Sequence, residues 1–162
     1  MKNYNVFKII TSVLCLNSLF STSVSSQTLV YGLVGDIQRG GFGGVLEYHW
    51  TDWIHSSPNF VLGWVGALQN DADGDGWLGF GVSGEYFLND NAFFEGSIIP
   101  GYYNQGPNDL GGVLHFRTTV GIGYKLSKTV SFSFAISHLS NAGFGDWNPG
   151  TDMMMLRLIN RF

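Results

Sequence analysis

The stretch TVSFSFAISHLS, residues 129–140, alternates large apolar side chains with small polar ones from end to end. The even positions hold Val130, Phe132, Phe134 and Ile136, and the odd positions hold Ser131, Ser133, Ala135 and Ser137. Successive side chains of a β-strand point to opposite faces of the sheet. The stretch therefore predicts a strand with one apolar face and one face of small, mostly polar side chains.

The same alternation recurs along the rest of the chain, in segments separated by clusters of Gly, Asn, Asp, Ser and Pro. The segments cover residues 28–38, 41–53, 59–69, 76–87, 92–103, 111–125, 129–140 and 151–162. Repeated alternating segments of about ten residues are the signature of a transmembrane barrel. We predict an all-β fold, an eight-stranded antiparallel transmembrane β-barrel of the outer membrane of a Gram-negative bacterium.

The connections between these segments predict how the barrel sits in the membrane. An even number of strands places both termini at the periplasmic end, together with the short connections at 54–58, 88–91 and 126–128. The loops at 70–75, 104–110 and 141–150 and the turn at 38–41 then face the outside.

The composition agrees with a membrane barrel and excludes one class of partner. The chain is 44% hydrophobic and only 12% charged, against about 25% charged for an average soluble domain. It has 8 Lys and Arg against 12 Asp and Glu. Nucleic-acid binding needs clustered positive charge to neutralise phosphates, so we expect no nucleic-acid partner.

The first 26 residues predict a secretory signal peptide. Lys2 and Lys8 flank a short n-region, the apolar stretch IITSVLCLNSLF follows, and STSVSS supplies small residues for cleavage before Gln27. The single cysteine, Cys15, then leaves with the signal, and Leu14 before it is not the small residue that a lipoprotein signal needs. The mature barrel, 27–162, keeps 6 basic and 12 acidic residues, so its charge is 6 − 12 = −6.

Charged side chains fall on the predicted inner face beside many glycines. They are Glu47, Glu85, Glu95, Arg117, Arg157 and Arg161. The interior of an eight-stranded barrel is just wide enough for side chains, and an isolated charge there is costly. We predict a paired internal network, with a catalytic cluster inside the barrel as the alternative.

Aromatic residues sort to the two rims when the strands are traced up and down. Trp50, Trp53, Tyr86 and Tyr124 are expected at one rim, and Trp77, Tyr102 and Tyr103 at the other. The last strand ends on Phe162, which resembles the C-terminal signal of bacterial outer-membrane proteins. The barrel assembly machinery that recognises this signal is therefore an expected partner.

Two motifs look like ligand sites but have simpler explanations. GFGVSG, residues 79–84, matches GxGxxG, yet no helix is expected after it, so we interpret it as barrel glycines. DADGDG, residues 71–76, matches the front of a calcium loop through Asp71, Asp73 and Asp75, but Val82 stands where the closing acid belongs. We interpret this stretch as an acidic external hairpin, with weak calcium binding as a hypothesis.

Three polar residues are predicted to converge on one patch that faces lipid. His138 and Ser140 lie on the apolar face of their strand, near its outer end, and Asp152 lies on the outward face of the adjacent strand. Polar groups that face the membrane are costly and are usually functional. Serine, histidine and carboxylate are the members of a catalytic triad, which is recognised by geometry and not by order along the chain.

The segments HLSNAG, residues 138–143, and NPGTD, residues 148–152, resemble the active-site signature of the outer-membrane lipid A 3-O-deacylases of the PagL type. The resemblance implies His138 as the base, Ser140 as the nucleophile and Asp152 as the acid, where a glutamate is common. It implies Asn148, or a backbone N–H nearby, as the oxyanion donor, with Asn141 in a supporting role. The implied substrate is lipid A in lipopolysaccharide of the outer leaflet, cleaved without a cofactor or a metal.

Two other functions stay open at this stage, and so does a homodimer. One is a non-enzymatic barrel of the OmpA or OmpX type, structural or adhesive through its loops, although short loops argue against adhesion. The other is a different lipid-acting barrel, either a phospholipase or an acyltransferase.

Overall fold

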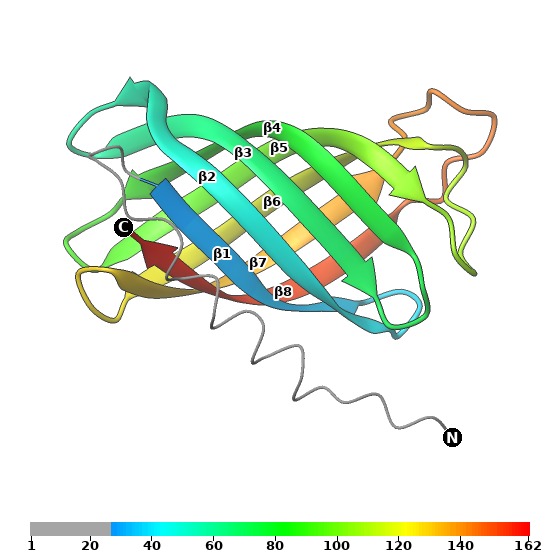
Figure 1. The fold of residues 1–162 in the computed structure, drawn as a ribbon, viewed down its shortest axis with the longest axis horizontal. Helices are drawn as coiled ribbons and strands as arrows, with labels where there is room; N and C mark the ends of the chain where they lie inside the picture. The colour runs from blue at the N-terminus through cyan, green and yellow to red at the C-terminus, as the bar shows by residue number, and fades with distance from the viewer. Residues whose placement is uncertain (1–26) are drawn as a thin grey trace.

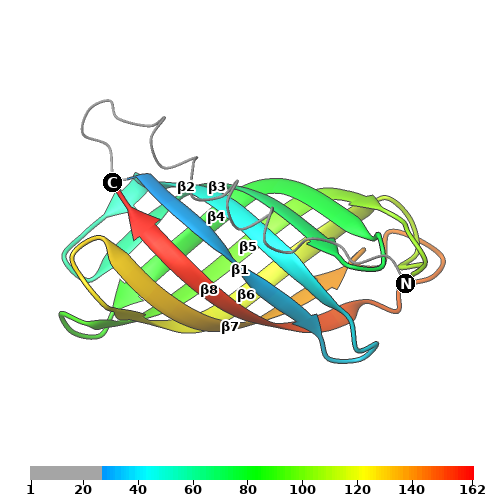
Figure 2. The ribbon, with the colours of Figure 1, turned by 60° about the horizontal axis from the view of Figure 1, so that its bottom comes forward.

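The computed structural model describes residues 27–162, where the chain forms a closed barrel of eight antiparallel strands (Figure 1). The predicted signal peptide and Cys15 lie outside the described residues. The strands are β1 (Gln27–Asp36), β2 (Phe42–Ser56), β3 (Phe60–Asp71), β4 (Gly76–Phe87), β5 (Ala92–Asn104), β6 (Leu114–Lys125), β7 (Val130–Ser140) and β8 (Thr151–Arg161). Each strand pairs with the next, and β8 pairs with β1 to close the barrel (Figure 2).

The two ends of the barrel differ in the way that the sequence predicts. At the terminal end, Gln27 and Phe162 exchange backbone hydrogen bonds of 3.3 and 3.0 Å, and the connections 57–59, 88–91 and 126–129 are short. The opposite end carries the residues 37–41, 72–75, 105–113 and 141–150, and we call it the loop end. The eight predicted strands are confirmed, and no helix long and apolar enough to cross a membrane is found among residues 27–162.

Two strands differ most from the prediction, each by three residues at one end, and all other strand boundaries agree within two residues. β2 continues to Ser56 instead of ending at 53, because a register shift between Trp50 and His55 and a positive φ of 67° at Asp52 allow it to bend and resume pairing. β6 begins at Leu114 instead of 111, because Gly111 and Gly112 take φ values of 82° and 110° that belong to a turn.

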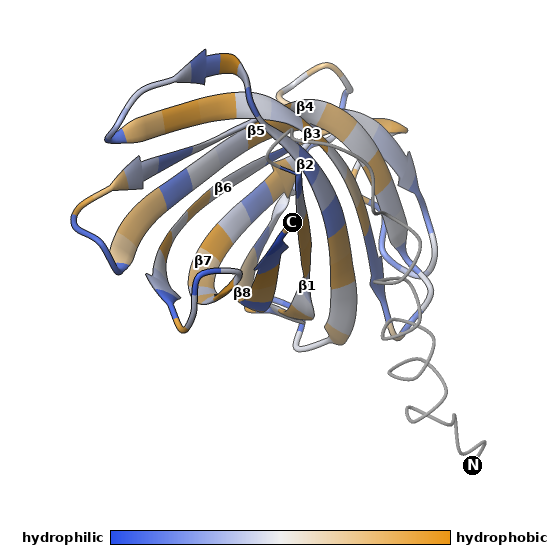
Figure 3. Ribbon diagram, turned by 60° about the vertical axis from the view of Figure 1, so that its left-hand side comes forward, coloured by the Kyte–Doolittle hydropathy of each residue, from blue (hydrophilic) through white to orange (hydrophobic). Residues whose placement is uncertain are grey.

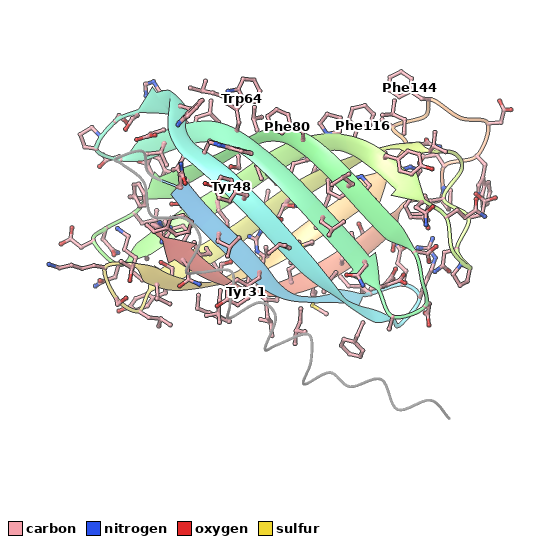
Figure 4. The ribbon with its side chains drawn as sticks, viewed as in Figure 1. Tyr31, Tyr48, Trp64, Phe80, Phe116 and Phe144 are labelled. Carbon is pink, nitrogen blue, oxygen red and sulfur yellow. The ribbon has the colours of Figure 1, made fainter. Side chains whose placement is uncertain are left out.

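The predicted faces are confirmed, since apolar and polar bands alternate along the strands (Figure 3). On β7, Phe132, Phe134 and Ile136 are exposed on the outside, whereas Ser131, Ser133 and Ser137 are buried inside. Figure 4 shows Trp64, Phe80 and Phe116 pointing away from the barrel wall. The outer surface is therefore the apolar one, as a surface in contact with lipid chains requires.

The interior charges form the predicted network of ion pairs. Glu47 pairs with Arg117 Nη2 and, through Oε2, with Arg157 Nη1 at 3.4 Å. Arg157 Nη2 reaches Glu95 Oε1 at 2.5 Å, and Arg161 Nη2 reaches Glu85 Oε1 at 2.8 Å. Arg117 and Glu47 are 0% and 1% exposed. Glu47, Arg117, Arg157 and Glu95 thus form one connected polar group inside the barrel, beside buried apolar side chains such as Val65, Ile99 and Met155.

The prediction that Trp77 and Tyr103 belong to the aromatic rim at the loop end is wrong. Trp77 and Tyr103 are 2% and 3% exposed and lie inside the barrel, whereas Tyr102 lies outside. Both inner rings are on the odd-numbered face of their strands, which is the interior face. Glycines make the room, because a Cβ at Gly79 or Gly101 would come within 2.4 and 2.6 Å of the Trp77 ring.

Candidate functional site

The patch predicted on the outer surface is present at the loop end of β7 and β8. His138 and Ser140 lie on the outward face of β7, two residues apart. Asp152 is the direct cross-strand partner of His138 in the antiparallel β7–β8 pair. The register of these two strands therefore brings the histidine and the carboxylate together.

A short hydrogen bond joins His138 to Asp152. The distance from His138 Nδ1 to Asp152 Oδ1 is 2.7 Å, and the two side chains are 49% and 46% exposed. In a neutral imidazole, a proton on Nδ1 that is donated to the carboxylate leaves the lone pair of Nε2 free to accept another. The pair is thus arranged as a base with an orienting acid.

Gly150 provides the space for the imidazole ring. A Cβ built on Gly150 would lie 3.0 Å from His138 Cε1 and 3.4 Å from Nε2. The same Cβ would lie 3.3 Å from the Leu139 carbonyl oxygen, so the Cε1–Nε2 edge of the ring lies against the backbone at Gly150. Gly150 also has a φ of 60°, a conformation that favours glycine.

Gly150→Ala should lower the activity of the site by about 10-fold or more, because the added methyl group displaces the His138 ring and a small misplacement of a catalytic group is costly. The measurement is the initial rate of ester cleavage on folded, purified barrel. Gly143→Ala is the matched control, since Gly143 has a φ of 80° but nothing within 4 Å of its Cβ position. Equal losses in the two variants would assign the effect to backbone strain alone.

The Ser140 hydroxyl is not hydrogen-bonded in the described part of the chain. Its side chain is partly buried, it pairs across to Phe116 of β6, and it makes no side-chain hydrogen bond within residues 27–162. Catalytic hydrogen bonds are often absent before substrate binds and form only in the complex.

The two asparagines have different surroundings. Asn141 is buried, and its Nδ2 donates to the carbonyls of Gly111 at 2.6 Å and Trp147 at 2.7 Å, so this side chain ties the two longest loops together. Asn148 is exposed, and its Oδ1 accepts the backbone N–H of Asn141 at 3.1 Å. Among residues 27–162, the amide NH2 of Asn148 has no acceptor and is available to donate, whereas both N–H bonds of Asn141 are used.

A turn that the sequence interpretation did not single out also reaches the site. Gln38 Nε2 donates to Asp152 Oδ2 at 3.0 Å, and Arg39 Nη2 donates to the Gly150 carbonyl at 2.9 Å. Both residues lie between β1 and β2. Closure of the barrel by the β1–β8 pair is the signal that could have found this turn, because closure places residue 38 beside the start of β8.

The surface next to the site is apolar. Phe144 and Trp147 of the 141–150 loop are exposed, and Phe144 stacks on Phe116 of β6 at a centroid distance of 5.8 Å (Figure 4). Met154 and Ile136 continue the exposed apolar surface along the strands. Polar reactive groups thus stand at the edge of a surface that suits acyl chains.

The acidic hairpin does not gather its carboxylates as cation ligands. Asp71 Oδ1 accepts the backbone N–H groups of Asp73, Gly74 and Asp75 at 2.8 to 3.0 Å. Asp75 accepts hydrogen bonds from Tyr103, Gly106 and Asn108, which outweigh the effect of burial and lower the pKa of Asp75. No group of three or more His, Cys, Asp or Glu in residues 27–162 is placed to hold a metal.

A second serine, histidine and carboxylate set lies inside the barrel. His49 Nε2 lies 2.8 Å from Glu47 Oε2, and His49 Nδ1 lies 2.9 Å from Ser83 Oγ. Glu47 is already shared by two arginines, and the barrel wall separates the set from the lipid-facing surface. We interpret this set as part of the polar core and not as the catalytic cluster that the sequence left as an alternative.

The comparisons with known proteins identify the family of the chain and its fold. The model of one family, described as lipid A 3-O-deacylase (PagL), matches residues 37–159. The crystal structure of the outer membrane enzyme PagL is similar, with 22% identity over 84% of this chain and 99% of that chain and a TM-score of 0.67. No curated protein matches the chain significantly.

Other barrels share the fold at lower identity. A designed transmembrane β-barrel is 12% identical over 88% of this chain and all of that one, with a TM-score of 0.56. The attachment invasion locus protein Ail of Yersinia pestis is 11% identical over 86% of this chain and all of that one, also with a TM-score of 0.56. These likenesses concern the barrel alone.

Proposed function

The chain belongs to the lipid A 3-O-deacylase (PagL) family of outer-membrane β-barrels, and on this basis we propose that it removes the 3-O-linked acyl chain of lipid A with Ser140, His138 and Asp152. The observation that carries the assignment of residues is the 2.7 Å contact between His138 and Asp152 on the outward face, beside Ser140. The paired charges inside the barrel are kept from lipid by the wall, whereas this set faces it.

In the proposed reaction, Ser140 Oγ attacks the ester carbonyl while its proton passes to His138 Nε2. The tetrahedral intermediate collapses with cleavage of the bond between the acyl carbon and the 3-oxygen of the sugar, and His138 gives its proton to that oxygen, which leaves as the 3-hydroxyl. Water then attacks the acyl-enzyme with His138 again as base, which releases the fatty acid and restores Ser140. Asp152 keeps the imidazole in the tautomer that this cycle needs.

The developing negative charge on the carbonyl oxygen requires a donor. The amide NH2 of Asn148 supports this role, since its Oδ1 is held by the Asn141 backbone and its two N–H bonds have no acceptor in the described part of the chain. A donor that is oriented before the reaction stabilises an oxyanion without reorganising. We assign Asn141 a supporting role, because its side chain holds the loop that carries Asn148.

The position of the site suits a substrate that approaches within the membrane. Lipid A is expected to lie beside the barrel, with its headgroup ester near the loop end and its acyl chains along the apolar surface around Ile136 and Met154. Recognition of the Phe162 strand by the barrel assembly machinery, and a homodimer, stay predictions.

Mass spectrometry of lipid A tests this function. Cells that produce the wild-type chain should contain lipid A that is lighter by one 3-O-linked acyl chain. Unchanged lipid A with a folded barrel in the outer membrane would contradict the proposal and favour a non-enzymatic barrel. A loss of acyl chains from phospholipids, or a gain of mass by lipid A, would instead indicate a phospholipase or an acyltransferase.

A further inference from the structure

We propose that Gln38, in the turn between β1 and β2, is a positioning residue that holds Asp152 in place for His138. This inference rests on the proposed function of the Ser140 site. Gln38 Nε2, Asp152 and His138 form a continuous chain of hydrogen bonds, with distances of 3.0 and 2.7 Å. Gln38 would act on the reaction only through the carboxylate.

The turn that carries Gln38 has a fixed backbone. Asp36 Oδ1 accepts the backbone N–H groups of Gln38 at 2.8 Å and Arg39 at 2.7 Å, which is the side-chain turn that Asp commonly forms. Asp36 pairs with Met153 across the β1–β8 closure. Gln38 therefore extends from an ordered turn that already lies next to the start of β8.

The same turn also holds the backbone at Asp152 and the two residues before it. The backbone N–H of Ile37 donates to the Asp152 carbonyl at 2.9 Å, and Thr151 Oγ1 donates to Asp36 Oδ2 at 2.6 Å. Arg39 Nη2 donates to the Gly150 carbonyl at 2.9 Å. The backbone of β8 is thus held by several contacts, and the contact of Gln38 is the one made to the Asp152 carboxylate itself.

The Asp152 carboxylate needs such a contact because it is about half exposed. Its Oδ1 accepts from His138 and its Oδ2 accepts from Gln38, so both oxygens are held. Without Gln38, rotation of the carboxyl group would be limited only by the single contact to the imidazole. A carboxylate held at both oxygens keeps the histidine ring in one orientation, which is the task of the acid in a triad.

The chemistry of an amide also suits this position. A neutral amide donates a hydrogen bond without placing a full positive charge on the carboxylate. A cation there would compete with the imidazolium for the charge of Asp152. The neighbouring cation, Arg39, contacts Asp36 Oδ2 at 3.4 Å and the Gly150 carbonyl, not Asp152.

The first test compares Gln38→Ala with wild-type barrel in steady-state kinetics on lipid A. Removing one hydrogen bond of this kind should lower kcat by about 3- to 10-fold with little change in KM, since Gln38 contacts the triad and not the substrate. Gln105→Ala is the matched control, because Gln105 is also an exposed glutamine at the loop end and has no side-chain hydrogen bond within the described residues. The control should keep wild-type kcat.

Gln38→Glu distinguishes a role of Gln38 in positioning the Asp152 carboxylate from a role in maintaining the backbone of the β1–β2 turn. The backbone contacts of the turn come from Asp36, so a glutamate of equal size should leave the turn intact. It replaces the donor by a second carboxylate beside Asp152, and the loss of kcat should equal or exceed that of Gln38→Ala. Wild-type kcat in both variants would overturn the proposal, as would a loss matched by an equal fall in the folded fraction.

The rate at which Ser140 is labelled by an alkyl fluorophosphonate gives a readout that does not depend on lipid A. Labelling needs the activated serine, so it should slow in both Gln38 variants and be absent in Ser140→Ala. If wild-type barrel is labelled but leaves lipid A unchanged, the proposed substrate fails and the role of Gln38 is still tested. If lipid A is cleaved but the labelling rate and kcat are the same in the Gln38 variants as in the wild type, the proposed function stands and only the role of Gln38 fails.

Discussion

Ser140→Ala should leave a folded barrel in the outer membrane and lower deacylation of lipid A by at least about 10³-fold, because the acyl-enzyme cannot form without the hydroxyl. The fold should be unaffected, since the Ser140 hydroxyl makes no hydrogen bond to any residue of the described chain. The measurement is the fraction of lipid A that has lost its 3-O-linked acyl chain, followed over time by mass spectrometry.

Ser83→Ala is the control for this experiment, because Ser83 lies 2.9 Å from His49 in the other serine and histidine set. We expect it to keep full activity, since that set is inside the barrel and away from lipid. Activity retained by Ser140→Ala and lost in Ser83→Ala would reverse the assignment and move the reaction into the barrel interior.

Glu47→Ala should have the largest effect on stability, a loss of about 3–5 kcal/mol in the free energy of unfolding. Glu47 is buried between Arg117 and Arg157 and also contacts His49. Removing it takes one carboxylate partner from each of two buried arginines. Arg117 then has no other carboxylate within ion-pair distance among the described residues.

Urea unfolding of the purified barrel in lipid vesicles measures this loss of stability. Glu85→Ala is the matched control, because its partner Arg161 and Glu85 itself are more exposed, with side-chain exposures of 18% and 13%. That variant should lose less stability. Equal unfolding midpoints for Glu47→Ala and wild type would show that the interior network contributes nothing to the stability of the barrel.

The strands were predictable because their signal is local. Alternation along 129–140 needs only the two-residue period of a strand, and the same period sorted Glu47, Arg117 and Arg157 to the inside. The contact between His138 and Asp152 was predictable as well, since two neighbouring antiparallel strands bring their outward residues at one end together.

Features that depend on volume or on the closure of the barrel were not predictable from the sequence. Trp77 was expected at a rim, and its place inside depends on the absence of a side chain at Gly79 and Gly101. The bend of β2 near Asp52 depends on a backbone conformation that the alternation does not encode. Gln38 lies 114 positions from Asp152 in sequence, and only the β1–β8 seam brings the two together.

That seam gives the proposed site a property of its own. Gln38 follows the first strand to be synthesised and Asp152 lies near the start of the last, and the two meet where β8 pairs with β1 (Figure 2). A chain still in transit, or a barrel with an open seam, lacks this contact. Closure of the barrel and completion of this hydrogen-bonded chain are then a single event, so the enzyme would reach its full rate only when its barrel is finished.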